Sequence, residues 1–492
     1  MASKDDIIAE LRALVEKQAK QIAAQAKQIA AQAKQITALT QEVAELKLKL
    51  AKANKDSSNS SKSPSSDITG AGKDKKKNKP GRPKKRKIGG QPGHRRNLRT
   101  PLPPERVDES FEYEIDPDEV CRLQLTPTGE FDIVQTIELP NSPVIVTEHR
   151  FALYQSPEGT IYYPFVPEVH NRPIFGPRLM ATIGWLKSQA HCSYSTIDQY
   201  FDDVLGVPVS RGYLAKLCTG IVSASLADAY EEAKAAIPDQ PQLGSDETSF
   251  KDNGKKNWVW CLSSAILTVF HIATSRSRKV LEELVGDEFK GYLNFDYYSA
   301  NCSFAWNYGI KAQYCWAHLI RDMRFLLKHP DQKTREWAEQ LLDRSRRLFS
   351  AWHSREEMTP HGFEFSMDLQ RDRFLEVVRN VPKSTEAANL AARFAVVSVS
   401  DGSTYDMSQD YFRFQFASGV EPTNNHSEQQ VRHVVIDRRI TQGTRSESGQ
   451  RFNERMWTAI ATCKKQQKNF FEYLHASIEA KLSGAAAPSL LH

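Results

Sequence analysis

Three acidic residues that lie far apart along the chain, Asp246, Asp296 and Glu428, have the types and settings needed for metal-dependent phosphate chemistry. Asp246 lies in the run LGSDET, which we predict to be a strand, and Asp296 directly follows the apolar run Tyr292–Phe295. Ligands gather outside the carboxyl ends of parallel strands, where Asp296 would lie. Two Asp and one Glu that converge supply the oxygen ligands that Mg²⁺ requires, and two-metal sites cut and rejoin phosphodiester bonds.

Glu428 is predicted to lie on a helix that turns this carboxylate toward the core. It shares a helical stripe with three valines, at spacings of three, six and seven residues: Val431, Val434 and Val435. A carboxylate so placed is costly unless it is paired or bound to metal. Simpler interpretations remain open, because Glu428 can pair with Arg432 for roughly 0.3–0.5 kcal/mol, and the two aspartates can be turn or strand-end residues.

Several separated motifs support the first interpretation. They are GGQPGH at Gly89–His94, DET at Asp246–Thr248, CWAHLIRDMR at Cys315–Arg324, and Glu421–Arg439 with the following TQGTRSESGQRFNER and CKKQQKNFFEYL. In this order, and with a heptad N-terminus, they resemble bacterial DDE transposases of the insertion sequence 66 family over nearly the whole chain. The resemblance implies that Asp246, Asp296 and Glu428 form the catalytic, metal-binding triad on a ribonuclease H-like sheet.

The activity that this resemblance implies is DNA transposition. Two Mg²⁺ about 3.5–4 Å apart, which Mn²⁺ can replace, would support cleavage at the element ends and attack of the 3′-hydroxyl on target DNA. Two other functions stay open: a catalytically inactive coiled-coil DNA-binding protein, and a ribonuclease H-like nuclease without strand transfer. Glu247 is expected to be dispensable, because its side chain points to the strand face opposite Asp246.

The composition is compatible with a multidomain protein of 492 residues with 40% hydrophobic content. We find neither an apolar run of about 20 residues nor a secretory signal, so we expect no membrane partner and a bacterial cytoplasmic, nucleoid-associated protein. The seven cysteines include no C-x-x-C pair. Family members often carry a paired-cysteine zinc module, but here Cys121 stands alone, so no structural zinc is expected.

The N-terminal segment 5–52 is predicted to form a coiled coil. β-branched residues or leucine recur every seventh residue from Ile8 to Leu50, and Leu11, Leu39 and Leu46 follow three places later, which favours a parallel dimer. Glutamines weaken the middle of the seam, and a lone amphipathic helix is the alternative. We therefore expect a homo-oligomer, at least a dimer, and the family resemblance suggests small accessory proteins of the same element.

The segment 53–104 is predicted to be a disordered basic linker. Residues 73–99 carry a net charge of +12, although the whole chain carries only +6. Within this segment one run resembles an AT-hook that inserts into the minor groove of DNA, with these candidate DNA-binding residues: Gly81, Arg82, Pro83, Lys84, Lys85 and Arg86. A solvated charge run that contacts any polyanion is the alternative.

The remaining chain is predicted to hold a β-rich remnant of the zinc module at 105–170, then a helical region at 171–240. In that region Thr196–Leu205 and Ser210–Thr219 have helix-turn-helix spacing, with Ser210 as N-cap, although plain helix packing explains them equally. A ribonuclease H-like core follows at 241–320, a helical insertion at 321–419, and the last core part with the Glu428 helix at 420–480. The fold class is therefore multidomain α+β.

Five further residues are candidates for supporting the triad or binding DNA. Cys315 and His318 form a C-x-x-H pair that resembles one found near the active site in several DDE transposase groups, so we expect a supporting role; a core cysteine with a hydrogen-bonded histidine is the alternative. The arginines that follow Glu428 are candidates for binding DNA phosphates: Arg432, Arg438 and Arg439. Part of this charge can also cap the helix.

Overall fold

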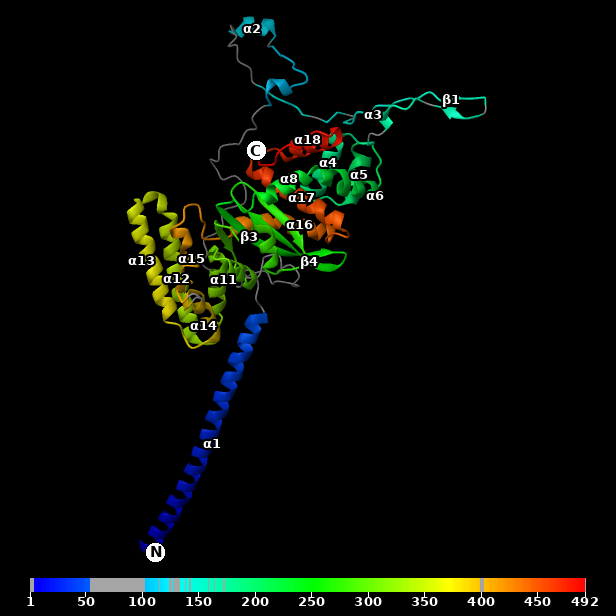
Figure 1. The fold of residues 1–492 in the computed structure, drawn as a ribbon. Coiled ribbons are helices and arrows are strands. Elements are labelled where there is room, and N and C mark those ends of the chain that lie inside the picture. Colours follow the sequence, from blue (N-terminus) through cyan, green and yellow to red (C-terminus); the bar gives the residue numbers. More distant parts are fainter. Residues whose placement is uncertain are drawn as a thin grey trace. The chain divides into compact units, whose positions relative to one another are not determined.

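The computed structural model describes residues 4–53, 173–398 and 402–491, together with most of 102–170. The described residues fall into two compact units (Figure 1), one within 1–71, 173–202 and 208–492, and the other within 72–172 and 203–207. The predicted disordered linker and AT-hook, including Gly81–Arg86, lie outside the described residues.

A five-stranded mixed sheet forms the centre of the first unit. Its strands are β3 (Gln242–Asp252), β4 (Lys255–Ser263), β5 (Thr268–Ala273), β6 (Tyr292–Phe295) and β7 (Lys311–Tyr314). They are arranged in the order β5-β4-β3-β6-β7. Strands β5, β4 and β3 pair antiparallel, whereas β3, β6 and β7 pair parallel, so the carboxyl ends of β3, β6 and β7 point the same way.

Two C-terminal helices cover one face and one edge of this sheet. Helix α16 (Asn425–Thr441) packs on β3 and β4, and α17 (Glu447–Lys465) packs on β5 (Figure 1). Between them lies an apolar core that includes Phe250, Val434 and Trp457. Because side chains alternate along a strand, Asp246 shares the face of Phe250, which is the face that α16 covers.

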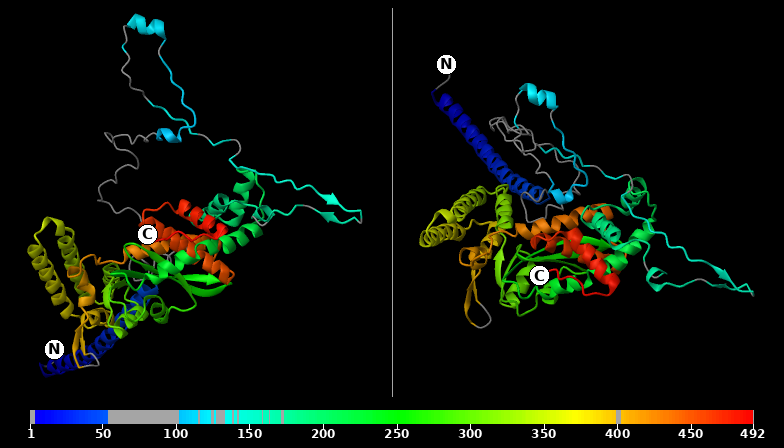
Figure 2. Two further views of the ribbon diagram at one scale, coloured as in Figure 1. Left: turned by 45° about the horizontal axis from the view of Figure 1, so that its top comes forward. Right: turned by 90° about the horizontal axis from the view of Figure 1, so that it is seen from above.

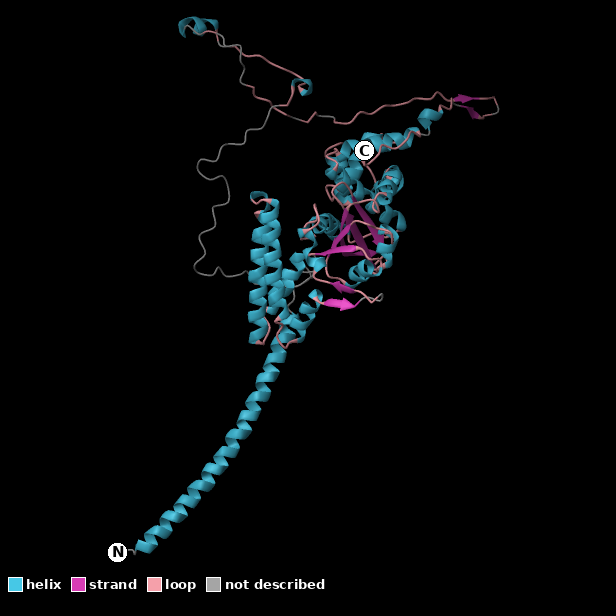
Figure 3. Ribbon diagram, turned by 60° about the vertical axis from the view of Figure 1, so that its left-hand side comes forward, coloured by secondary structure: helices cyan, strands magenta, loops and turns pink. Residues whose placement is uncertain are grey.

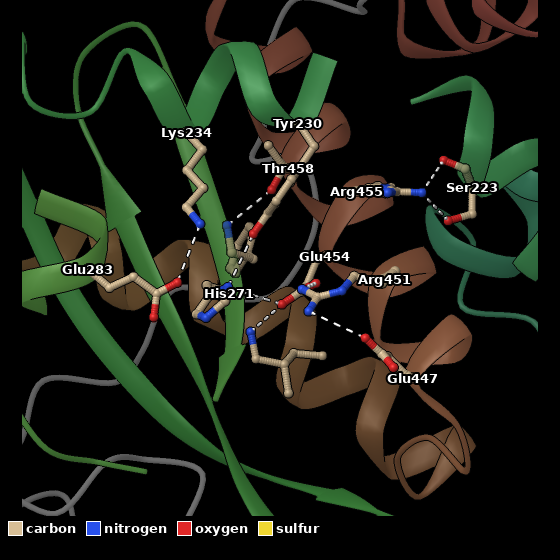
Figure 4. Close-up of polar contacts among 12 residues, drawn as sticks. Ser223, Tyr230, Lys234, His271, Glu283, Glu447, Arg451, Glu454, Arg455 and Thr458 are labelled. Carbon is tan, nitrogen blue, oxygen red and sulfur yellow. Dashed lines mark hydrogen bonds and ion pairs between the residues drawn. The ribbon is translucent and has the colours of Figure 1, made fainter. Parts of the chain in front are cut away.

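Helix α17 also protects the exposed edge of the sheet. Its side chains accept hydrogen bonds from the outward backbone N–H groups of β5: Glu454 Oε1 from Ile272 at 2.6 Å, Thr458 Oγ1 from Phe270 at 3.1 Å, and Thr462 Oγ1 from Thr268 at 3.1 Å. Figure 4 shows Glu454, Arg451 and His271 at this edge. Paired edge groups cannot recruit another strand, so the sheet ends at β5.

Three helices connect or follow the later strands. Helix α9 (Lys279–Val285) joins β5 to β6, α10 (Ser299–Asn307) joins β6 to β7, and α11 (Trp316–Leu326) follows β7. Asp296 therefore occupies the short connection between β6 and α10, and Cys315 occupies the junction of β7 with α11.

The helical region that precedes the sheet contains short helices. They are α4 (Pro177–Ser188), α5 (Tyr194–Asp203), α6 (Arg211–Leu217), η3 (Cys218–Val222), α7 (Ser223–Ser225) and α8 (Ala227–Ala235), and α4 packs against the C-terminal α18 (Phe470–Ser483). Ser210 is the N-cap of α6, as predicted, because its side chain accepts a hydrogen bond from the Tyr213 N–H at 3.2 Å. The interior side chains of α5 and α6, such as Ile197 and Leu214, are fully buried, which is consistent with plain helix packing.

The expected insertion, 321–419, is built around two long neighbouring helices, α12 (Gln332–His353) and α13 (Pro360–Arg379) (Figure 3). Shorter elements complete it: η4 (Arg355–Glu357), α14 (Thr385–Ala391), η5 (Ala392–Phe394), β8 (Val396–Ser398), β9 (Thr404–Asp406), α15 (Gln409–Phe412) and η6 (Arg413–Gln415). Two further views show α12 and α13, in yellow, on the side of the sheet away from α4 and α18 (Figure 2).

The second unit differs from the β-rich module that was expected over 105–170. In its described residues the elements are η2 (Pro104–Arg106), α2 (Pro117–Leu123), α3 (Pro167–His170) and a two-stranded ribbon of β1 (Tyr154–Gln155) and β2 (Ile161–Tyr162). Several of its large apolar side chains are exposed, including Tyr113, Val134 and Ile145. A two-stranded ribbon is marginal by itself, and alternation cannot specify a sheet where nothing packs on its apolar face.

The N-terminal segment is one continuous helix, α1 (Lys4–Ala53), where a coiled coil was predicted. The predicted seam residues Ile22, Ile29 and Ile36 are about two-thirds exposed. Such a regular apolar stripe is unusual on an isolated soluble helix. Across the described parts of the chain, no helix combines the length and apolar character needed to cross a membrane.

Candidate active site

Three elements bring the predicted carboxylates to the same end of the sheet. Asp246 lies in β3, Asp296 directly follows β6, and Glu428 lies in the first turn of α16, which covers β3. Burial raises the pKa of Asp246 well above its usual value, and three neighbouring carboxylates raise it further: Glu247, Asp296 and Glu428. The sequence separation of the triad is therefore bridged by the fold.

The pKa of Asp296 is also raised by burial and by neighbouring carboxylates. Burial and then the charge of Glu247 raise its pKa to about 7, although Arg276 and Asn301 oppose the rise. Its Oδ1 accepts a hydrogen bond from the Asn301 amide at 3.2 Å, and Asp246 Oδ1 accepts one from the Glu247 backbone N–H at 2.9 Å. Clustered carboxylates with raised pKa values are typical of sites that bind cations or transfer protons.

The loop before α16 fixes where the helix that carries Glu428 begins. The Asn424 amide donates to the Ser245 carbonyl at 2.7 Å, and the Asn294 amide donates to the Glu421 carbonyl at 2.8 Å. The Trp316 backbone N–H donates to the Pro422 carbonyl at 2.9 Å. One loop is thus tied to the ends of β3, β6 and β7, and this places the first turn of α16 over Asp246.

Gly244 supplies the space for this contact. A Cβ at this position would lie 2.1 Å from Ser427 Oγ and 2.6 Å from Asn424 Oδ1. We therefore predict that Gly244→Ala displaces the start of α16, lowers the melting temperature, and reduces activity more than the stability loss explains. Gly220→Ala is the matched control, since a Cβ there meets nothing within 4 Å. Equal activity in the two variants, measured at a temperature where both are folded, would contradict this role.

Glu428 is held by two side chains of α11. His318 Nδ1 lies 3.5 Å from Glu428 Oε1, and an Arg321 nitrogen lies 3.5 Å from Glu428 Oε2. Burial and the charge of Arg321 lower the pKa of His318 to about 4, so the ring is neutral near pH 7. Arginine can only donate, so the 3.1 Å contact from Arg321 makes His318 Nε2 the acceptor and leaves the proton on Nδ1, facing Glu428.

Cys315, His318 and Glu428 bring three potential metal-ligand atoms to within 4.8 Å of one another, which the three carboxylates of the triad do not do. The hydrogen bonding disfavours a zinc site there. His318 Nδ1 carries a proton rather than a free lone pair, and Arg321 adds a positive charge. The Cys315 sulfur accepts the Asn424 N–H at 3.2 Å, and burial raises its pKa to about 11. We interpret both residues as supports for Glu428 and its loop.

The raised pKa values make a stability prediction for the metal-free protein. A buried acid whose folded-state pKa exceeds its unfolded value binds more protons when folded, so stability falls as pH rises from about 4 to about 7. Asp246→Asn and Asp296→Asn remove this repulsion. Each should raise the free energy of unfolding by roughly 1–3 kcal/mol at pH 8, and by less at pH 5, in denaturant titrations. Destabilisation at pH 8 would show that the carboxylates do not repel one another.

The candidate DNA-binding arginines of α16 have different surroundings. Arg432 and Arg439 are exposed, whereas Arg438 is half-buried and donates to Thr248 Oγ1 at 2.9 Å and to the Ser249 carbonyl. Arg438 therefore ties α16 to β3. Sequence reasoning did not assign to the site several residues around the triad: Gly244, Arg276, Asn294, Asn301, Arg321 and Asn424; it expected Glu247 to be dispensable. Signals for four of these seven residues were present in the runs LGSDET, which holds Gly244 and Glu247, CWAHLIRDMR, which holds Arg321, and EPTNNHSE, which holds Asn424.

Comparison with known families agrees with this arrangement. A family model described as "Transposase IS66 family" matches residues 172–452, which include the whole sheet and all three carboxylates. A second model, described as "Family of unknown function (DUF6444)", matches residues 3–100. No curated protein matches the chain.

Proposed function

Because this chain belongs to the IS66 family of transposases, we propose that it cuts the ends of an insertion sequence and joins their 3′-hydroxyls to target DNA, using Asp246, Asp296 and Glu428. The family implies a nucleic-acid-processing enzyme with DNA as its partner. The observation that carries the proposal is the convergence of these carboxylates from β3, the end of β6 and the start of α16. The strand order supports a ribonuclease H-like core.

The family also suggests the use of divalent metal. The donor set fits Mg²⁺, with Mn²⁺ as a substitute, because its three members offer only carboxylate oxygens and already repel one another. When bound, two such ions would activate the attacking hydroxyl and stabilise the leaving oxygen. Asp246 and Asp296 would hold them from the sheet, and Glu428 would complete the set from α16.

The surrounding side chains prepare the triad for this role. Glu428 Oε1 is buried and accepts no hydrogen bond, because its nearest N–H group, His318 Nδ1, lies 3.5 Å away, so this oxygen is available as a ligand. Arg321 faces the second oxygen, Oε2, at 3.5 Å, so N–H groups of α11 lie against both oxygens of the Glu428 carboxylate and fix its orientation. Exposed Arg432 and Arg439 lie on the same helix and are suited to contact DNA phosphates.

Transposition requires two DNA ends to be held together, and the exposed apolar stripe of α1 supports a second copy of this chain as its partner. A parallel dimer through α1 would join two active sites. We further propose that the basic segment 73–99, including the AT-hook-like run at Arg82, contacts DNA, and that small accessory proteins of the element assist.

The test uses DNA duplexes that carry the ends of the element and a labelled strand. The purified full chain should release the 3′ end and join it to a target plasmid in Mg²⁺ or Mn²⁺, but not in EDTA. Cleavage without joined product would favour the nuclease alternative. Metal-independent binding with neither reaction would favour the inactive DNA-binding protein.

A further inference from the structure

Glu247 is a fourth buried carboxylate beside the triad. It follows Asp246 in β3 and points to the opposite face of the sheet, where its side chain is 2% exposed. Arg276 donates to Glu247 Oε1 through Nε at 2.7 Å and also through a terminal nitrogen. Burying an ion pair costs desolvation free energy, so we asked which neighbouring groups this pair contacts.

These neighbours connect Glu247 to Asp296 by two routes. Asn301, on α10, donates to Asp296 Oδ1 at 3.2 Å, and its amide, like Arg276, also favours the charged form of Glu247 and so opposes the rise in pKa that burial causes. The Arg276 guanidinium lies 3.7 Å from the ring centroid of Tyr298, two residues after Asp296. The segment from Asp296 to α10 therefore contacts the Glu247–Arg276 pair twice: Asn301 contacts Glu247, and Tyr298 contacts Arg276.

We propose that Glu247 is a positioning residue for Asp296, acting through Arg276 and Asn301 to fix the Asp296 carboxylate for metal binding. This rests on the proposed function and replaces the expectation from sequence that Glu247 is dispensable. Asp296 lies just beyond β6, where strand hydrogen bonds no longer hold the backbone, so its direction depends on side-chain contacts. The geometry supplies them: Asn301 is fully buried on α10, and Arg276 lies over the ring of Tyr298, the N-cap residue of that helix.

A purely structural ion pair would behave differently, and the chain contains a matched example. Glu454 is fully buried on α17, and its Oε2 accepts from Arg451 at 2.8 Å at the β5 edge (Figure 4). Both carboxylates thus hold an arginine and a neighbouring element of the same sheet. They differ in that Glu454 has no contact with Asp296, so its loss tests for a general effect of opening the sheet.

The experiment compares the full-length wild type with Glu247→Gln, Asn301→Ala and the control Glu454→Gln. Mn²⁺ binding is measured by calorimetry without DNA, and the Mg²⁺ concentration for half-maximal cleavage is measured with labelled ends. Glu247→Gln and Asn301→Ala should each weaken Mn²⁺ binding, and raise the Mg²⁺ requirement, by about 10-fold or more, as is usual for groups that orient metal ligands. Glu454→Gln should lower the melting temperature. Both metal measurements should stay within about twofold of wild type, because a substitution at a distant, independent site has little effect on the metal ligands.

The possible outcomes distinguish failure of the positioning role from failure of the proposed function. Wild-type Mn²⁺ binding by Glu247→Gln, or by Asn301→Ala if the first variant does not fold, would overturn the positioning role and leave the proposed function intact. An equal metal effect in Glu454→Gln would also overturn it, since the effect would then come from general destabilisation. If the wild type itself bound no Mn²⁺ while Asp246→Asn behaved identically, the proposed metal site would fail, and the positioning role would fail with it.

Discussion

Replacing Asp246 or Asp296 by Asn, or Glu428 by Gln, should reduce metal-dependent cleavage and strand transfer by roughly 10³-fold or more, because each change removes one charge from a set that acts as a unit. The substitutions preserve side-chain size, and the aspartate changes relieve repulsion, so folding and DNA binding should persist. The assay is end cleavage and joining on labelled duplexes, with circular dichroism as the check on folding.

The triple variant should be little worse than any single one, because groups that act together are strongly non-additive. Asp252→Asn is the matched control. It lies at the far end of the same strand β3, where its carboxylate accepts a hydrogen bond from Thr444 Oγ1 at 2.7 Å, and it should keep most of the activity. Near wild-type strand transfer by any triad variant would remove that residue from the catalytic set.

Deleting residues 1–53 should convert the protein from a dimer to a monomer and abolish joining that requires two ends. The apolar stripe of α1 is the basis, since Ile22, Ile29 and Ile36 are each about two-thirds exposed on a single helix. Light scattering should show the mass fall by about half, beyond the loss of the helix itself. Single-end cleavage should be less affected, because the described sheet and triad do not include α1.

A sharper form of the test leaves the chain length unchanged. Ile22→Asp together with Ile29→Asp places charges in the predicted seam and should give the same dissociation. Lys20→Ala together with Lys27→Ala changes α1 outside that stripe and serves as the control, which should stay dimeric. A mass that is the same for the wild type and the aspartate variant would rule out α1 as the assembly element.

The core could be predicted from sequence because its signals are local. Strand signals in the sequence, bounded by turn residues, cover Gln242–Phe250, Trp258–Ser264, Leu267–Ala273 and Lys311–Cys315. They differ by no more than three residues at either end from β3, β4, β5 and β7. The stripe of Val431 and Val434 likewise indicated the buried face of α16. Once these elements were predicted, the positions of the carboxylates along them followed.

The parts that could not be predicted depend on contacts between distant segments. Strand alternation correctly placed Glu247 on the face opposite Asp246, but it gave no sign that Arg276 and Asn301 would link this side chain to Asp296. The same holds for Asn424, whose amide ties the loop before α16 to β3 across the sheet. The β-rich module predicted over 105–170 fails for a different reason, because described apolar side chains there, such as Tyr113 and Val134, are exposed rather than packed.

The most direct test of the central claim is a crystal of the full chain soaked in Mn²⁺, with diffraction measured at the manganese absorption edge. The proposed function predicts anomalous peaks for two ions ligated by Asp246, Asp296 and Glu428, and their loss in Asp246→Asn crystals grown in the same form. No peak among these carboxylates, or a single peak between Cys315 and His318 instead, would contradict the assignment of the three carboxylates as the metal-binding triad.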